Sequence, residues 1–397
     1  MAKKGFELKT ITRLISSDSD KPNWSLCVGA GISIPIFPSW YALAKNLANT
    51  LIPGSDLDEE MLTDLAFSAD ALIQMVKNKT KISDKDFAIK MSEILYSDFK
   101  EKIEPNDWPA IVKILEANHL SKITAKEWDV FNKYRDTVLK NTTSSVIAKS
   151  VFKAIEAGIS PKSILSFNAE PLLLVMLNSL LMQSKTDEDH PIPKQLFNKV
   201  TGSLSNQNDK RIQYVFCHGL LPLSNKSDKF TYSTEKLVFS EEEYLQIANN
   251  SFSWQATTFI NTCTTQHIIF IGTSLTDPNM RRWLSWTHSN RLNEMKEYNL
   301  NVEDSTQHYW IKEKPKNRDL MPWIESAVSH LGVRLIWLDS WSQAGEALEL
   351  ALGLRKREAA PKINKTYKKK NNNQQRRKTH SKKDNVKHRN NKKNEAR

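Results

Sequence analysis

Short apolar segments alternate with helical patterns along most of the chain, and this alternation limits the fold more than any other feature. Six segments, rich in β-branched and aromatic residues, are apolar at nearly every position, as strands buried on both faces are. They are Trp24–Val28, Ser163–Phe167, Gln213–Cys217, His267–Ile271, His308–Ile311 and Val333–Leu338. The helical patterns are Ser39–Leu51, Pro171–Gln183, Glu241–Asn261, Asn279–Lys296 and Asp319–Leu331. This order predicts an α/β protein with a doubly wound parallel sheet.

One interval, between Leu51 and Ser163, departs from this alternation because it contains no convincing strand. Its patterns are amphipathic and helical, at Leu62–Val76, Phe87–Tyr96, Ala110–Leu120 and Val146–Ile155. We therefore expect a helical insertion over residues 55–158, within one larger domain of residues 1–354.

The positive charge of the chain is concentrated at its C-terminal end. Residues 355–397 hold 18 Lys or Arg and three acids, a net of +15 against +12 for the whole chain, which leaves −3 for residues 1–354. With few apolar residues, this tail cannot offset its ordering entropy and is expected to be disordered. It is a solvated end, a tether to phosphate backbones or a ligand for an acidic partner surface. Because Tyr367 is its only aromatic residue, nucleic-acid binding should be nonspecific.

The three cysteines, Cys27, Cys217 and Cys263, are too far apart in sequence to form a zinc ribbon. Each lies in or beside an apolar segment, so we expect small core residues in a reducing compartment and no metal site. The N-terminal 15 residues lack the apolar core of a signal peptide, and no segment approaches the roughly 18 apolar residues that cross a membrane. The sequence predicts a cytoplasmic protein without membrane association.

Glycine or polar residues follow four of the predicted strands. They are Gly29-Ala30-Gly31-Ile32-Ser33, Asn168-Ala169-Glu170, His218-Gly219 and Gly272-Thr273-Ser274-Leu275. Taken singly, the glycine motif is more often a tight turn, the histidine is more often structural, and Asn168 is also compatible with a helix cap. Because the carboxyl ends of parallel strands share one edge of the sheet, their convergence favours a dinucleotide pocket there.

The glycine turn allows backbone N–H groups to approach a phosphate, and the helix from about Ser39 adds partial positive charge. However, the full dinucleotide fingerprint is absent, and no acidic residue stands at a strand end about 20 positions later. A simple dehydrogenase is therefore disfavoured.

In this order, the four motifs resemble those of the sirtuin superfamily, and most closely its bacterial sirtuin-like branch in antiphage defence. Pro38-Ser39-Trp40 and Asp277-Pro278-Asn279 also look typical of that branch. The resemblance covers roughly residues 20–350 and implies a Rossmann-like fold that binds NAD. It makes His218 the catalytic base and Asn168 the residue at the nicotinamide ribose. The other residues that it places around NAD are Gly29, Ala30, Gly31, Ser33, Trp40, Glu170, Gly272, Thr273, Ser274, Asp277 and Asn279.

Two departures distinguish this chain from protein-deacylating sirtuins. Those proteins resemble one another in a four-cysteine zinc module, which the three cysteines of this chain cannot build. They also carry an Asp-Phe-Arg after the glycine turn, where this chain reads Ile36-Phe37-Pro38-Ser39-Trp40. The defence branch resembles this chain because it also lacks the zinc module and the Asp-Phe-Arg motif. Its members hydrolyse NAD to nicotinamide and ADP-ribose. We therefore expect a NAD hydrolase that depletes cellular NAD on activation. The alternative is a non-catalytic module that senses NAD or ADP-ribose and recruits nucleic acid or a partner protein.

The chemistry of the two central residues suits this reaction. Cleavage of the nicotinamide–ribose bond develops oxocarbenium character on the ribose, and nicotinamide leaves as a neutral molecule. His218 is suited to accept a proton, while Asn168 can donate and accept hydrogen bonds to orient a hydroxyl and the water. The resemblance further implies homo-oligomers and companions such as a HerA-type ATPase or a short Argonaute, which restrain the enzyme until infection.

Overall fold

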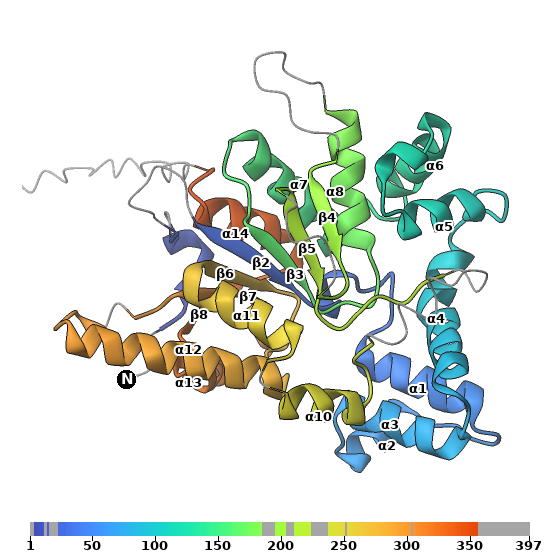
Figure 1. The fold of residues 1–397 in the computed structure, drawn as a ribbon, viewed down its shortest axis with the longest axis horizontal. Coiled ribbons are helices and arrows are strands. Elements are labelled where there is room, and N and C mark those ends of the chain that lie inside the picture. The colour runs from blue at the N-terminus through green and yellow to red at the C-terminus, as the bar shows by residue number, and fades with distance from the viewer. Residues whose placement is uncertain are drawn as a thin grey trace, which may run out of the picture. The chain divides into compact units, whose positions relative to one another are not determined.

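A computed structural model describes residues 4–11, 14–15, 23–184, 195–203, 210–223, 237–250, 252–302 and 305–355. Eight strands form one sheet in the order β1-β8-β7-β6-β2-β3-β5-β4, and all neighbouring strands are parallel (Figure 1). The strands are β1 Phe6–Glu7, β2 Trp24–Val28, β3 Ser163–Ser166, β4 Phe197–Val200, β5 Ile212–Phe216, β6 His267–Ile271, β7 His308–Glu313 and β8 Val333–Leu338. The predicted α/β class is confirmed.

The order of the inner strands locates the crevice of the sheet. The sequence β5-β3-β2-β6-β7-β8 reproduces the 3-2-1-4-5-6 order of dinucleotide-binding Rossmann sheets. The chain runs from β2 to β3 and β5 on one side, and returns to β6, β7 and β8 on the other. Because this order reverses between β2 and β6, the crevice for a ligand lies outside the carboxyl ends of these two strands.

Helices cover both faces of the sheet, which explains why the strands are apolar at nearly every position (Figure 1). Along β2, Leu26 and Val28 face one core and Cys27 the other. The first core is completed by helices α1 Trp40–Leu51, α7 Thr143–Glu156, α8 Leu172–Gln183 and α14 Ala344–Ala351. The second is completed by α11 Trp254–Thr265, α12 Pro278–Glu297 and α13 Met321–Ser329.

Residues 52–162, all of which the structure describes, contain helices and no strand. Besides α7, the helices are α2 Glu59–Leu65, α3 Ala69–Thr80, α4 Asp84–Glu101, α5 Trp108–Glu116 and α6 Ala125–Asp136. α1 contacts both α3 and α4, so this helical region packs on the first helix of the sheet domain. The division into an insertion of residues 55–158 and a domain of residues 1–354 stays a prediction.

Two segments that were each expected to form one helix contain the start of a second helix. The segment Glu241–Asn261 forms α10, Glu241–Asn249, and the beginning of α11, because the Ser253 hydroxyl accepts a hydrogen bond from Ala256 N and caps a second helix. Leu62–Val76 is likewise divided at Ser68, whose hydroxyl caps α3 through Ala71 N.

No sequence pattern predicted β1 or β4, and residues 356–397, nearly all of the predicted tail, lie outside the described residues. In the described parts of the chain, no helix combines the length and the apolar character that crossing a membrane requires.

Candidate active site

The glycine turn after β2 packs backbone to backbone against the loop after β6. Gly31 N donates to the Gly272 carbonyl over 2.9 Å, and a Cβ on Gly31 would lie only 2.7 Å from that oxygen. Gly272 has a φ of +70°, and a Cβ there would lie 2.6 Å from Ile32 N. Side chains are therefore excluded from both positions, and backbone forms this junction at the switch point of the sheet.

Hydrogen bonds also fix the rest of the loop after β6. Trp310 Nε1 donates to the Thr273 carbonyl over 3.1 Å, while the exposed Ser274 and Thr276 hydroxyls hydrogen-bond each other over 2.6 Å. Asp277 then begins α12 by accepting hydrogen bonds from Asn279 N and Met280 N. These contacts give the loop a defined shape on the side where the resemblance places the adenosine half of NAD.

Asn168 follows β3 and belongs to a buried polar cluster with Ser33 and Glu170. Its Nδ2 donates to Glu170 Oε1 over 2.9 Å and to Ser33 Oγ over 3.3 Å, and Ser33 Oγ donates to the same carboxylate oxygen over 2.6 Å. Asn168 is 3% exposed, yet its Oδ1 is buried and has no hydrogen-bond partner among the residues that the structure describes. An unsatisfied buried acceptor costs about 1–3 kcal/mol, which indicates that Oδ1 serves a ligand or a water molecule.

Glu170 anchors this cluster. Besides Ser33 and Asn168, the N–H of Leu172 at the start of α8 donates to its Oε2 over 2.5 Å. Burial raises the pKa of Glu170 to about 7, although the hydrogen bonds from Ser33, Leu172 and Asn168 oppose this rise. The carboxyl group is therefore close to half-protonated at neutral pH.

His218 follows β5 and is 7% exposed. Its Nδ1 lies 3.2 Å from the Tyr244 hydroxyl, and its Nε2 lies 3.4 Å from Asp277 Oδ2. The ring also packs edge-on against Phe167, the neighbour of Asn168, with 4.7 Å between centroids. Burial raises the pKa of Tyr244, so its phenol keeps its proton. The protonated Tyr244 hydroxyl can therefore donate to Nδ1 of His218, while Nε2 faces the Asp277 carboxylate.

Eight of the predicted site residues line two small cavities, whereas Gly29, Gly31, Gly272, Thr273 and Ser274 line neither. Ala30, Ser33, Trp40, Asn168 and Glu170 line a cavity of about 20 Å³. His218, Asp277 and Asn279 line another of about 10 Å³. One water molecule needs roughly 10–15 Å³, so the walls must separate before a dinucleotide enters.

The segment before α10 lines the cavity at His218 and packs against a wall residue of the cavity at Asn168. Phe239 packs on Trp40 with 5.3 Å between ring centroids, while Val238 lines the cavity at His218. Tyr244 was not predicted as a site residue, because a single tyrosine in an amphipathic helix carries no sign of its partner. A separation of the two cavity walls therefore involves α10 and the residues that lead into it.

The cysteines have the predicted core role. All three are free thiols, and burial raises the pKa of each well above its ordinary value, so none is a reactive thiolate. Over the residues that the structure covers, no three His, Cys, Asp or Glu side chains come together in a way that would hold a metal ion.

Residues 177–331 match the model of a family described as the SIR2-like domain. The match begins within α8 and ends after α13, so it includes His218, Tyr244 and the loop after β6 but begins after the glycine turn and Asn168. No curated protein matches the chain. SIR2-like domains bind NAD and are often NAD-utilising enzymes, so the match fits a sirtuin-like, NAD-related function.

Proposed function

We propose that this chain, sirtuin-like over residues 177–331, is a NAD hydrolase that releases nicotinamide and ADP-ribose. The observation that carries the proposal is the partnerless Oδ1 of Asn168, at the end of the strand beside the one that His218 follows. A buried acceptor and a base at neighbouring strand ends are what hydrolysis of a glycosidic bond needs.

The backbone junction supports binding of the dinucleotide. In the turn from Gly29 to Ser33, Ala30 is the one residue whose N–H makes no backbone hydrogen bond among the described residues, so its N–H would contact the pyrophosphate. Gly272, Thr273 and Ser274 would contact the adenosine half. The glycines fit this role because a Cβ would occupy the space between the two loops. The nicotinamide ribose would then lie toward Asn168 and His218.

In the proposed reaction the bond between ribose C1′ and the pyridinium nitrogen breaks, and its electron pair leaves with neutral nicotinamide. A water oxygen bonds to C1′ and transfers its proton to His218, so NAD and water give nicotinamide, ADP-ribose and a proton. Asn168 Oδ1 accepts a hydrogen bond from the ribose hydroxyl or the attacking water. Asp277, which is 3.4 Å from Nε2, stabilises the imidazolium that forms.

The closed geometry supports a resting enzyme that requires activation. Tyr244 and Asp277 engage both nitrogens of His218, and the two cavities are too small for NAD. We propose that activation moves α10 and frees Nδ1. Such control suits an antiphage effector that depletes cellular NAD, acting as a homo-oligomer or with a HerA-type ATPase, and contacting nucleic acid through residues 355–397.

A second candidate function is a non-catalytic sensor of NAD or ADP-ribose. The same engagement of both imidazole nitrogens favours it, because a histidine held on both sides needs no role as a base.

The experiment that separates the two functions follows NAD consumption by the wild type, Asn168→Ala and His218→Ala, each alone, with DNA and with a HerA-type ATPase. We expect consumption by the wild type only, with unchanged melting temperatures in the variants. Consumption by a well-folded His218→Ala protein would remove His218 from the mechanism. NAD binding without consumption under every condition would favour the sensor.

A further inference from the structure

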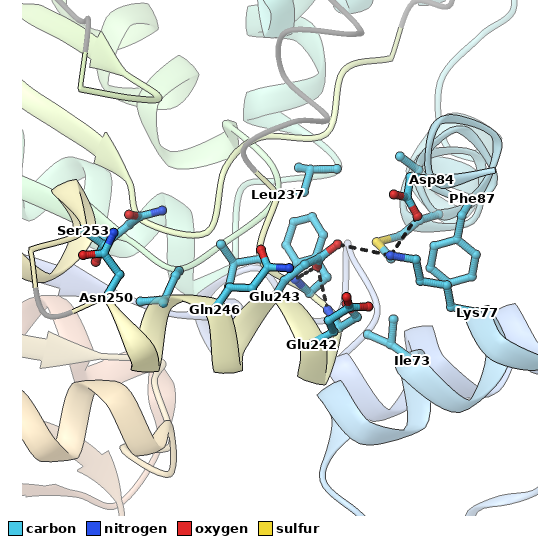
Figure 2. Close-up of a pocket in the computed structure, with 17 residues that line it drawn as sticks. Ile73, Lys77, Asp84, Phe87, Leu237, Glu242, Glu243, Gln246, Asn250 and Ser253 are labelled. Carbon is cyan, nitrogen blue, oxygen red and sulfur yellow. Dashed lines mark hydrogen bonds and ion pairs between the residues drawn. The ribbon is translucent and has the colours of Figure 1, made fainter.

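A pocket of about 440 Å³ lies between the helical region and α10, outside the two small cavities (Figure 2). Helices α3 and α4 form one wall, and residues 237–255 form the other. Its volume is within the range of small-molecule sites, whereas the cavities at Asn168 and His218 admit only water.

One end of the pocket is charged, with an excess of carboxylates. Lys77 Nζ lies 2.9 Å from Asp84 and 3.6 Å from Glu243, and Glu242 stands beside them (Figure 2). Burial lowers the pKa of Lys77, but the hydrogen bond to Asp84 and the charges of Glu243 and Glu242 raise it by more. The net pKa is raised, so Lys77 keeps its proton. Three carboxylates against one ammonium disfavour a phosphate-bearing ligand and attract a cation.

The remainder of the lining is mostly apolar, with two aromatic rings. The apolar residues include Ile73, Phe87, Met91, Leu237 and Phe239. Such walls suit a ligand with an apolar or aromatic body, and aromatic faces also attract cations.

One buried polar side chain in this lining has hydrogen-bonding capacity left. The Ser240 hydroxyl is 1% exposed, and the capping box with Glu243 is its one hydrogen-bonding contact among the described residues. A hydroxyl oxygen has two lone pairs, so Ser240 Oγ can still accept a hydrogen bond from a ligand such as an amine.

The pocket adjoins the candidate active site without including its central residues. Val238, Ile247 and Gln255 line both this pocket and the cavity at His218. A ligand in the pocket would also touch Glu243, the neighbour of Tyr244, on the helix that holds His218.

We propose that this pocket binds a small organic cation, a protonated amine on an apolar or aromatic body, at a site distinct from that of NAD. The carboxylates attract the ammonium, Ser240 Oγ accepts one of its hydrogen bonds, and the apolar walls hold the body. Binding of the cation does not depend on catalysis.

Three probes of similar size test the charge preference by calorimetric titration of the full chain: phenethylamine, phenethyl alcohol and phenylacetate. We expect phenethylamine to bind saturably at millimolar concentrations, about tenfold more tightly than the alcohol, with no binding of the carboxylate. Equal affinity for amine and alcohol, or no saturable binding of the amine, would overturn the proposal.

Two adjacent residues of α10 supply a matched pair of variants for the location of the site. Gln246 is exposed and lines the pocket, whereas Leu245 is exposed at 56% and does not. Gln246→Trp should abolish phenethylamine binding and Leu245→Trp should preserve it, with similar melting temperatures. Glu242→Gln should weaken binding about threefold, as loss of one exposed charge does. Retained binding in Gln246→Trp, or loss of binding in Leu245→Trp, would show that the amine binds elsewhere and contradict the assignment.

Discussion

Asn168 and His218 follow neighbouring strands and differ in how fully they are paired. The amide nitrogen of Asn168 is held by Glu170 and Ser33 while its oxygen is unsatisfied, whereas both nitrogens of His218 have partners. In the proposed reaction, Asn168 would therefore already be oriented for a substrate, whereas His218 would first have to exchange a partner.

The burial of Glu170 should affect how the free energy of unfolding depends on pH. Its pKa of about 7, against 4.5 for an ordinary glutamate, means that between these values the native state binds more protons than the unfolded chain. The native state therefore loses stability as pH rises. Because Gln does not ionise, Glu170→Gln should gain about 2 kcal/mol relative to the wild type between about pH 5 and pH 8. Urea unfolding at both pH values checks this, and a constant difference would contradict the burial of an ionisable carboxyl.

Gly272 should tolerate a side chain less well than a glycine that shares only its backbone conformation. Gly54 has a φ of +74° and nothing within 4 Å of the place that a Cβ would take, whereas a Cβ on Gly272 would meet Ile32 at 2.5 Å. We expect Gly54→Ala to cost about 1 kcal/mol through backbone strain alone. Gly272→Ala should cost about 3 kcal/mol, because a steric clash is added to that strain. Equal losses in urea unfolding would mean that the two loops separate easily.

At the scale of elements, six strands could be predicted to within two residues at each end, because burial on both faces makes them apolar throughout. β1 and β4 could not: β1 has two residues, and β4 reads Phe-Asn-Lys-Val at the edge of the sheet. The strand-end motifs located the candidate site. The partners of His218 could not be found, because Tyr244 and Asp277 are brought to it by α10 and α12 from distant parts of the chain.

The sequence signal for the start of α11, a serine at position 253, was present but weaker than the helical periodicity around it. Ser253 caps this helix through Ala256 N over 3.2 Å. Ser253→Ala should therefore lower the free energy of unfolding by about 1 kcal/mol, and Ser253→Asp, which keeps an acceptor, should restore most of it. Thermal unfolding of the three proteins is the measurement. A neutral Ser253→Ala variant would mean that packing against the sheet, rather than the cap, determines where α11 begins.

For the whole molecule, the sheet order places the glycine junction, Asn168 and His218 on one edge, and the helices fill both faces. The small cavities at this edge indicate that the architecture is complete before the substrate enters. Control of the enzyme would therefore lie in movement of α10, not in formation of the fold.

The basic tail, residues 355–397, should act independently of the candidate active site. A chain that ends at residue 355 is expected to keep its melting temperature and its NAD cleavage but to lose retention on DNA. Affinity of the full chain for DNA should fall about a thousandfold between about 50 and 200 mM salt, whatever the sequence, because binding would rest on phosphate contacts. Salt-insensitive or sequence-dependent binding in a filter assay would contradict this role.

We propose that the protein transfers the ADP-ribosyl group of NAD to water. The most direct measurement is the amount of nicotinamide and of ADP-ribose formed by the activated wild type, quantified together from the same reaction by chromatography. We predict equal amounts of the two products from the wild type and neither from Asn168→Ala. Nicotinamide without matching ADP-ribose would show transfer to another acceptor, and equal products from Asn168→Ala would place the chemistry elsewhere.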